Sequence, residues 1–143
     1  MNDVKLAADP YNLIIAGVGG QGKSALAMVL GRELDPQFPG GVLWVEIGPG
    51  ADEAGRRAEI VNRIALALGL DLKDEPRPEV REATVRGELG CQGRLLAILD
   101  DLWEVDAGRW LRERLLPDGA AVLVTSHRPL TMEPRMNPAS RRC

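Results

Sequence analysis

Apolar positions along the chain follow two different periods, and their alternation predicts a parallel sheet flanked by helices. Four short runs are nearly continuously apolar or rich in β-branched residues, which is typical of strands covered on both faces. They span residues 12–16, 42–47, 95–100 and 120–125. Between them, apolar residues recur every three or four positions, as on one face of a helix. These helical segments span residues 23–34, 53–68, 79–89 and 107–115. The pattern predicts a three-layer α/β fold.

Composition and charge narrow the classes of function. The 143 residues carry a formal net charge of -3, with 45% hydrophobic and 27% charged residues, which is ordinary for a globular domain. Bulk electrostatics therefore indicate neither a nucleic-acid nor a membrane partner. No run approaches the roughly 20 apolar residues of a membrane span, and no signal peptide is evident. Cys91 and Cys143 have no disulfide or metal-ligand spacing, so we expect a cytoplasmic protein.

A glycine-rich segment joins the first predicted strand to the first predicted helix. Residues 17–24 read GVGGQGKS, which matches the GxxxxGK[ST] pattern of a phosphate-binding loop. Glycines let backbone N–H groups turn toward phosphate oxygens, and the helix N-terminus adds partial positive charge. We expect Lys23 to bind β- and γ-phosphate oxygens and Ser24 to bind Mg²⁺. A plain glycine turn is the alternative, but the strand–loop–helix context favours nucleotide binding.

Two adjacent carboxylates end the third predicted strand. Residues 95–101 read LLAILDD, so an apolar strand delivers Asp100 and Asp101 to its carboxyl end. Ligands of open α/β sheets bind at that edge, where the phosphate loop also opens. We expect Asp100 to orient Mg²⁺ and its waters, and Asp101 to act as a general base on an attacking water. The alternative is a pair of aspartates that only caps the next turn.

Three segments together resemble the NB-ARC module of the STAND class of P-loop signalling NTPases. They read GVGGQGKSALA, LLAILDDLW and AAVLVTSH, at residues 17–27, 95–103 and 120–127. The family carries GxGGxGK[ST]TLA, an apolar strand ending in DD-x-W, and a later strand ending in VTTR. With the segment around the second predicted strand, the resemblance covers residues 12–128. It implies an intracellular switch that exchanges ADP for ATP, passes the change to fused domains, and resets by slow hydrolysis.

The resemblance also assigns roles to single residues. Phosphate-loop positions match at Gly17, Gly19, Gly20, Gly22, Lys23 and Ser24. It implies that Ser24 and Asp100 bind the metal ion and that Asp101 is the adjacent acidic residue, with a catalytic role. Trp103 matches the tryptophan that follows the aspartate pair, and we expect it to pack without taking part in the chemistry.

The third motif departs from the family pattern. The family arginine that senses the γ-phosphate falls on His127, and an arginine follows at Arg128. Either Arg128 reaches the phosphate through a shifted turn, as a catalytic residue, or the sensing contact is lost. His127, the only histidine, is more readily explained as a surface residue.

We expect a lead-in at residues 1–11, a partial NB-ARC-like domain at 12–130 and a disordered tail at 131–143. The family continues into a fifth strand and helical subdomains, but no apolar periodicity follows Arg128. Related ATPases imply that the predicted strands lie side by side in the order 42–47, 95–100, 120–125 and 12–16, which is 2-3-4-1 in chain numbering. The strand at 12–16 would then be an open sheet edge. An apolar open edge invites self-association or pairing with a partner protein.

Two other classes of function remain open from the sequence. One is a free-standing P-loop ATPase or small-molecule kinase, although no arginine-rich lid segment is evident. The other is a remnant of the fold that acts only as an interaction module. Nucleotide affinity separates the interaction module from the switch and the enzymes, and turnover with ATP alone separates an ATPase from a kinase.

Overall fold

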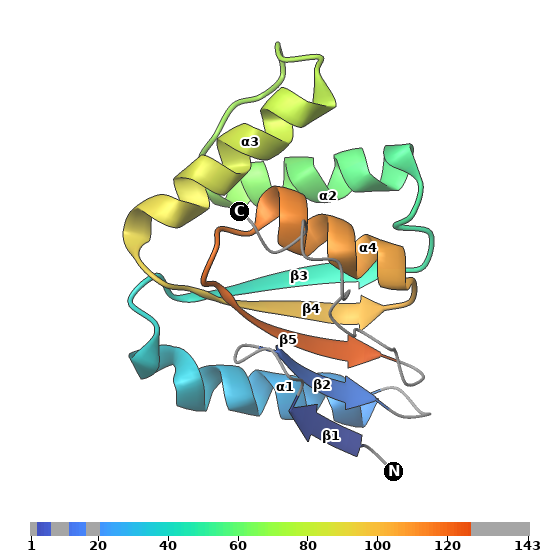
Figure 1. Cartoon of the computed structure of the whole chain (residues 1–143), viewed down its shortest axis with the longest axis vertical. Coiled ribbons are helices and arrows are strands. Elements are labelled where there is room, and N and C mark those ends of the chain that lie inside the picture. Colours follow the sequence, from blue (N-terminus) through green and yellow to red (C-terminus); the bar gives the residue numbers. More distant parts are fainter. Residues whose placement is uncertain (1–2, 7–11, 17–20, 127–143) are drawn as a thin grey trace, which may run out of the picture.

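The fold is described from a computed structural model, for residues 3–6, 12–16 and 21–126. A five-stranded sheet runs through the middle of the molecule in the order β1-β2-β5-β4-β3, as Figure 1 shows. The strands are β1 (Asp3–Leu6), β2 (Asn12–Ala16), β3 (Val42–Gly48), β4 (Leu96–Leu102) and β5 (Ala121–Ser126). Neighbours among β2, β5, β4 and β3 are parallel. This arrangement confirms the α/β fold class and the predicted order of the four parallel strands.

The predicted open edge at residues 12–16 is wrong. Strand β1 pairs antiparallel with β2, from Asp3 opposite Ala16 to Leu6 opposite Leu13. The N-terminal segment therefore supplies the backbone partners that the parallel order alone leaves missing. Self-association through β2 loses its physical basis, because its N–H and C=O groups already face a strand on each side.

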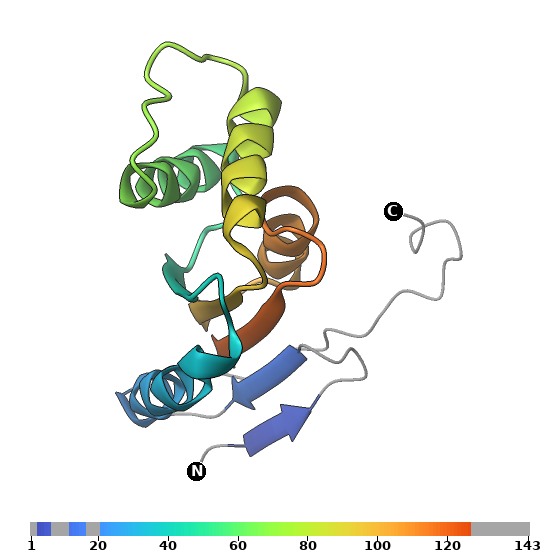
Figure 2. The same ribbon diagram turned by 90° about the vertical axis from the view of Figure 1, so that its left-hand side faces the viewer.

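Helices cover both faces of the sheet, as the two views in Figures 1 and 2 show. Helix α1 lies on one face, and α2, α3 and α4 lie on the other. Their bounds are α1 (Gln21–Leu34), α2 (Ala54–Ala67), α3 (Pro78–Leu89) and α4 (Val105–Trp110), with single 3₁₀ turns at Asp35–Gln37 and Gly90–Gln92. All four predicted helices are present. The last one differs in form, because a π-helical turn, Leu111–Leu115, continues α4.

The apolar core consists of two layers, one on each side of the sheet. Strand β4 shows the division best, because Ala97 and Leu99 belong to the layer beneath α2, α3 and α4. Its alternate residues Leu96 and Ile98 belong to the layer beneath α1. This burial on both faces is why the strand reads as a continuous apolar run.

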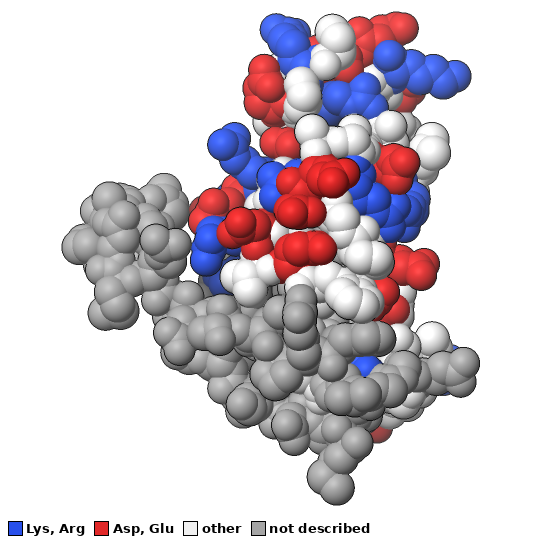
Figure 3. Space-filling model, turned by 90° about the vertical axis from the view of Figure 1, so that its right-hand side faces the viewer, with Lys and Arg blue, Asp and Glu red and all other residues white. Residues whose placement is uncertain are grey.

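The described surface carries mixed charge. Acidic and basic side chains are interspersed over the described part of the face in Figure 3. In the described part of the chain, no helix combines the length and the apolar character that crossing a bilayer requires.

A close backbone contact joins the start of β3 to the start of β4. The Gly40 N–H donates to the carbonyl oxygen of Arg94 at 2.8 Å. A Cβ atom at Gly40 would lie 2.4 Å from the carbonyl oxygen of Gly93 and 2.9 Å from that of Arg94. Both are backbone atoms, so the contact has no flexible side chain that can give way.

We predict that Gly40→Ala destabilises the fold by about 1–3 kcal/mol, because the methyl group forces the two segments apart. Thermal melting followed by circular dichroism should shift down by roughly 3–10 °C. Gly87→Ala is the matched control, since a Cβ atom there meets nothing within 4 Å inside α3. The control should be neutral or more stable by about 0.5–1 kcal/mol. Equal melting of the two variants would contradict the prediction.

Candidate functional site

The first turn of α1 lies at the carboxyl edge of the parallel strands. It contains Gly22, Lys23 and Ser24, the last three residues of the glycine-rich motif. The Lys23 side chain points into the protein, with only 3% of the residue exposed. A buried ammonium group needs groups of opposite charge around it, so this lysine is not an ordinary surface residue.

Asp100 joins three elements of the structure at this edge. The Ser24 hydroxyl donates to Asp100 Oδ1 at 2.8 Å, which links α1 to β4. The Thr125 hydroxyl donates to the same oxygen at 2.7 Å, which links β5 to β4. Only 8% of Asp100 is exposed. A carboxylate this buried is costly unless it is paired, and the two hydroxyl groups provide hydrogen bonds in place of water.

Asp101 has an unusual backbone. Its φ angle is 65°, in the left-handed region that aspartate tolerates better than most residues. Its N–H donates to Thr125 Oγ1 at 2.8 Å, and its Oδ1 accepts a hydrogen bond from Trp103 Nε1 at 2.9 Å. The aspartate is therefore held at its backbone by β5 and at its side chain by the residue two positions later.

The structure brings together three of the residues that the sequence proposed, namely Ser24, Asp100 and Asp101. Strand β4 continues to Leu102, so both aspartates lie inside the strand, near its carboxyl end, and not after it. Gly22 and Lys23 lie beside Ser24 in the first turn of α1. The other candidates, Gly17, Gly19, Gly20, His127 and Arg128, lie outside the described residues.

Two residues of the site were missed or given too small a role. Trp103 was expected only to pack, yet its indole N–H reaches the Asp101 carboxylate. Thr125 was treated as part of an apolar strand, yet its hydroxyl contacts both aspartates. A signal was available for Thr125, because a hydroxyl residue at the end of a strand that is expected to be buried on both faces requires a hydrogen-bond partner, and the structure shows it 1% exposed.

The donor atoms at this edge suit a magnesium ion. The Ser24 hydroxyl and the Asp100 carboxylate are hard oxygen ligands, and they lie close enough to share one ion. Magnesium commonly takes only one or two protein ligands and completes its shell with phosphate and water. Within residues 3–6, 12–16 and 21–126, no group of three or more His, Cys, Asp or Glu side chains is placed to hold a metal ion. A magnesium site that is completed by phosphate and water does not need such a group of three protein ligands.

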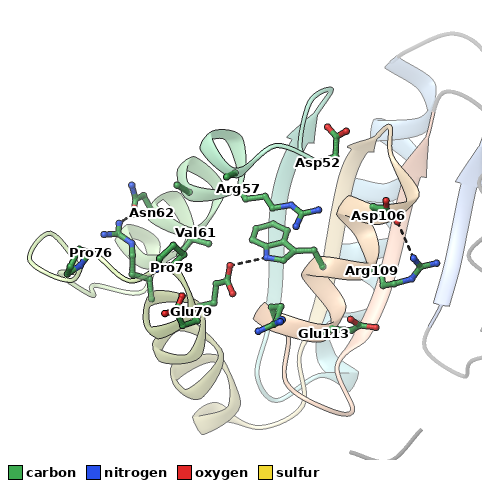
Figure 4. A pocket seen from close by; sticks show the side chains of 16 residues that line it. Asp52, Arg57, Val61, Asn62, Pro76, Pro78, Glu79, Asp106, Arg109 and Glu113 are labelled. Carbon is green, nitrogen blue, oxygen red and sulfur yellow. Dashed lines mark hydrogen bonds and ion pairs between the residues drawn. The ribbon is translucent and has the colours of Figure 1, made fainter. Parts of the chain in front are cut away.

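A groove of about 860 Å³ lies elsewhere, among α2, α3 and α4 (Figure 4). Trp110 is one of the residues that line it, with its indole N–H donating to Glu82 at 3.0 Å and the Arg57 guanidinium 5.0 Å from its ring centroid. Neither Ser24 nor the aspartate pair lines this groove. It is therefore distinct from the edge at which the glycine-rich motif and the aspartates meet.

The strand order, and a helix that begins on a GKS sequence beside a strand-end aspartate, define a P-loop NTPase fold. The family comparison is more specific. The NB-ARC domain model matches residues 3–129, and the chain belongs to this family of nucleotide-binding modules, whose members generally bind ADP or ATP. No curated protein gives a significant match to the sequence.

We predict that Trp103→Phe lowers the free energy of unfolding by about 1–2 kcal/mol, because a half-buried carboxylate loses its indole donor. Trp44→Phe is the matched control, with the same loss of volume. Trp44 is 38% exposed and its indole makes no hydrogen bond to any described residue, so its effect should stay within about 0.5 kcal/mol. Urea unfolding followed by far-UV circular dichroism measures both. Equal effects of the two substitutions would refute the role of the indole N–H.

Proposed function

We propose that this chain is the ADP/ATP-binding switch module of a STAND-type signal-transduction protein. The observation that carries the proposal is the 2.8 Å hydrogen bond from Ser24 to Asp100. It joins the end of the phosphate-loop motif to the aspartate of the apolar strand, although 76 positions separate them in sequence. These are the two groups that a magnesium nucleotide needs at one point.

In this proposal each residue has a defined task. The glycines of the loop, Gly17, Gly19, Gly20 and Gly22, direct backbone N–H groups toward phosphate oxygens. Lys23 pairs with the β- and γ-phosphates, which explains a charged side chain that is turned inward. Ser24 and Asp100 hold Mg²⁺. The bound ion neutralises phosphate charge.

Slow hydrolysis is part of the same proposal. Asp101 would accept a proton from an attacking water, and Trp103 restricts its carboxylate through Oδ1. The second oxygen, Oδ2, has no hydrogen bond to any described residue, and we propose it as the atom that accepts the proton. Arg128, or His127 in its place, is proposed to contact the γ-phosphate.

A cytoplasmic setting fits the proposed switch. Cys91 is an exposed free thiol, which suits a reducing compartment. The output of the switch is a protein partner or a fused domain, as the family implies, and not a second copy paired through β2.

Calorimetry with Mg-ADP and Mg-ATP on the purified chain tests the proposal. We expect both nucleotides to bind, with slow release of phosphate from ATP alone. Absence of binding would contradict the proposal and leave an interaction module. Turnover that appears only with an added phosphate acceptor would indicate a kinase instead.

We predict that Lys23→Ala weakens nucleotide binding by about 10–150-fold, because it removes a charge-assisted contact worth roughly 1.5–3 kcal/mol. Lys73→Ala is the control, since this lysine is exposed and lies between α2 and α3. It should bind nucleotide as the wild type does. Calorimetric titration measures both, and equal affinity of wild type and Lys23→Ala would overturn the phosphate-loop assignment.

The two aspartates should differ in phenotype. Asp100→Ala should weaken binding only when Mg²⁺ is present, because its carboxylate serves the ion. Asp101→Asn should keep the affinity and slow phosphate release, because the amide cannot accept the proton. Titrations with Mg²⁺ and with EDTA, together with a phosphate-release assay, separate the two effects. Hydrolysis by Asp101→Asn at the wild-type rate would refute the general-base role.

A further inference from the structure

One buried hydroxyl group contacts both aspartates of the site. Thr125 is 1% exposed, donates to Asp100 Oδ1 at 2.7 Å and accepts from the Asp101 N–H at 2.8 Å. A backbone N–H can only donate, so the hydroxyl oxygen must be the acceptor there. Its single hydrogen is then available for the carboxylate of Asp100. The chemistry of the groups thus fixes the direction of both hydrogen bonds.

The position of Thr125 in the sheet explains why a side chain does this work. The ladder between β4 and β5 ends at the pair Leu99 and Val124. Beyond it, Asp101 adopts a left-handed backbone conformation within β4, and the Thr125 hydroxyl accepts a hydrogen bond from its N–H. Strand β5 itself stays in register with β2 at this point, since Thr125 lies opposite Ile15. The hydroxyl therefore projects from a backbone that is fixed by its other neighbour.

The two hydroxyl groups on Asp100 differ in where they are anchored. Ser24 belongs to the phosphate-loop motif, whereas Thr125 lies on β5, the central strand of the sheet. We infer that Thr125 is the positioning residue that holds Asp100 at the magnesium ion and sets the backbone conformation of Asp101, an inference that rests on the proposed function. Without this hydroxyl, Ser24 is the one hydroxyl donor left to the Asp100 carboxylate among the described residues, and the Asp101 N–H loses its acceptor.

Three substitutions isolate the hydroxyl group. T125V removes it and preserves the volume, T125S keeps it and removes the methyl group, and T125A removes both. T125V differs from the wild type by a methyl group in place of the hydroxyl group, and T125A differs from T125S by a hydrogen in place of it. The second pair keeps the test usable if T125V does not fold.

The first measurement needs no nucleotide. Amide hydrogen exchange at Asp101 should become about 3–10-fold faster in T125V and T125A, since a net hydrogen bond is worth about 0.5–1.5 kcal/mol. T125S should exchange like the wild type. Wild-type exchange at Asp101 in both T125V and T125A would overturn the role of the hydroxyl group.

The second measurement is the ratio of ADP affinity in Mg²⁺ to that in EDTA. We expect this ratio to fall about tenfold in T125V and T125A, with unchanged affinity in EDTA. T125S should keep the wild-type ratio. An unchanged ratio in T125V, or T125S behaving like T125A, overturns the inference alone. A wild-type chain that binds no nucleotide overturns the proposed function, and the magnesium role of Thr125 with it.

Discussion

The burial of one carboxylate constrains the whole carboxyl edge of the sheet. Asp100 is 8% exposed, so folding removes most of its water and must replace it with hydrogen bonds. The replacements come from Ser24 on α1 and Thr125 on β5. Because each bond needs its donor within about 3 Å, the helix and both strands must meet in one register. The demand of a single buried charge thus fixes the place where the glycine-rich motif meets the sheet.

The apolar layers make that meeting possible. Strand β4 is buried on both faces, and its polar residues are confined to its carboxyl end. The rest of the strand is apolar, so it places no polar side chain that needs a partner in the interior of the sheet. Parallel strands then bring their carboxyl ends to one edge, where Asp100 and Thr125 arrive from neighbouring strands. Fold and site follow from the same placement of polar residues.

Sequence patterns predicted much of the fold and the centre of the site, and their failures have physical reasons. Long periodic segments predicted the helices, and the analogy to related ATPases predicted the parallel order. Strand β1 was not predicted, because a pattern of four residues is too short to distinguish a strand from a loop. The hydrogen bonds of Trp103 and Thr125 depend on side-chain direction and on the positive φ of Asp101, which no residue type reveals alone.

The corrected edge changes what kind of scaffold carries the phosphate loop. Strand β2, which precedes the loop, is paired on both sides and so is an interior strand. At the opposite edge, Arg63 of α2 donates to the carbonyl oxygen of Glu46 on β3 at 3.1 Å, which occupies an acceptor that another strand would need. The edge at β3 is thus partly protected against strand addition, and β1 forms the other edge of the sheet. Strands β2, β5 and β4 are the interior strands of the sheet, and they provide the frame for the residues that we propose to face the nucleotide.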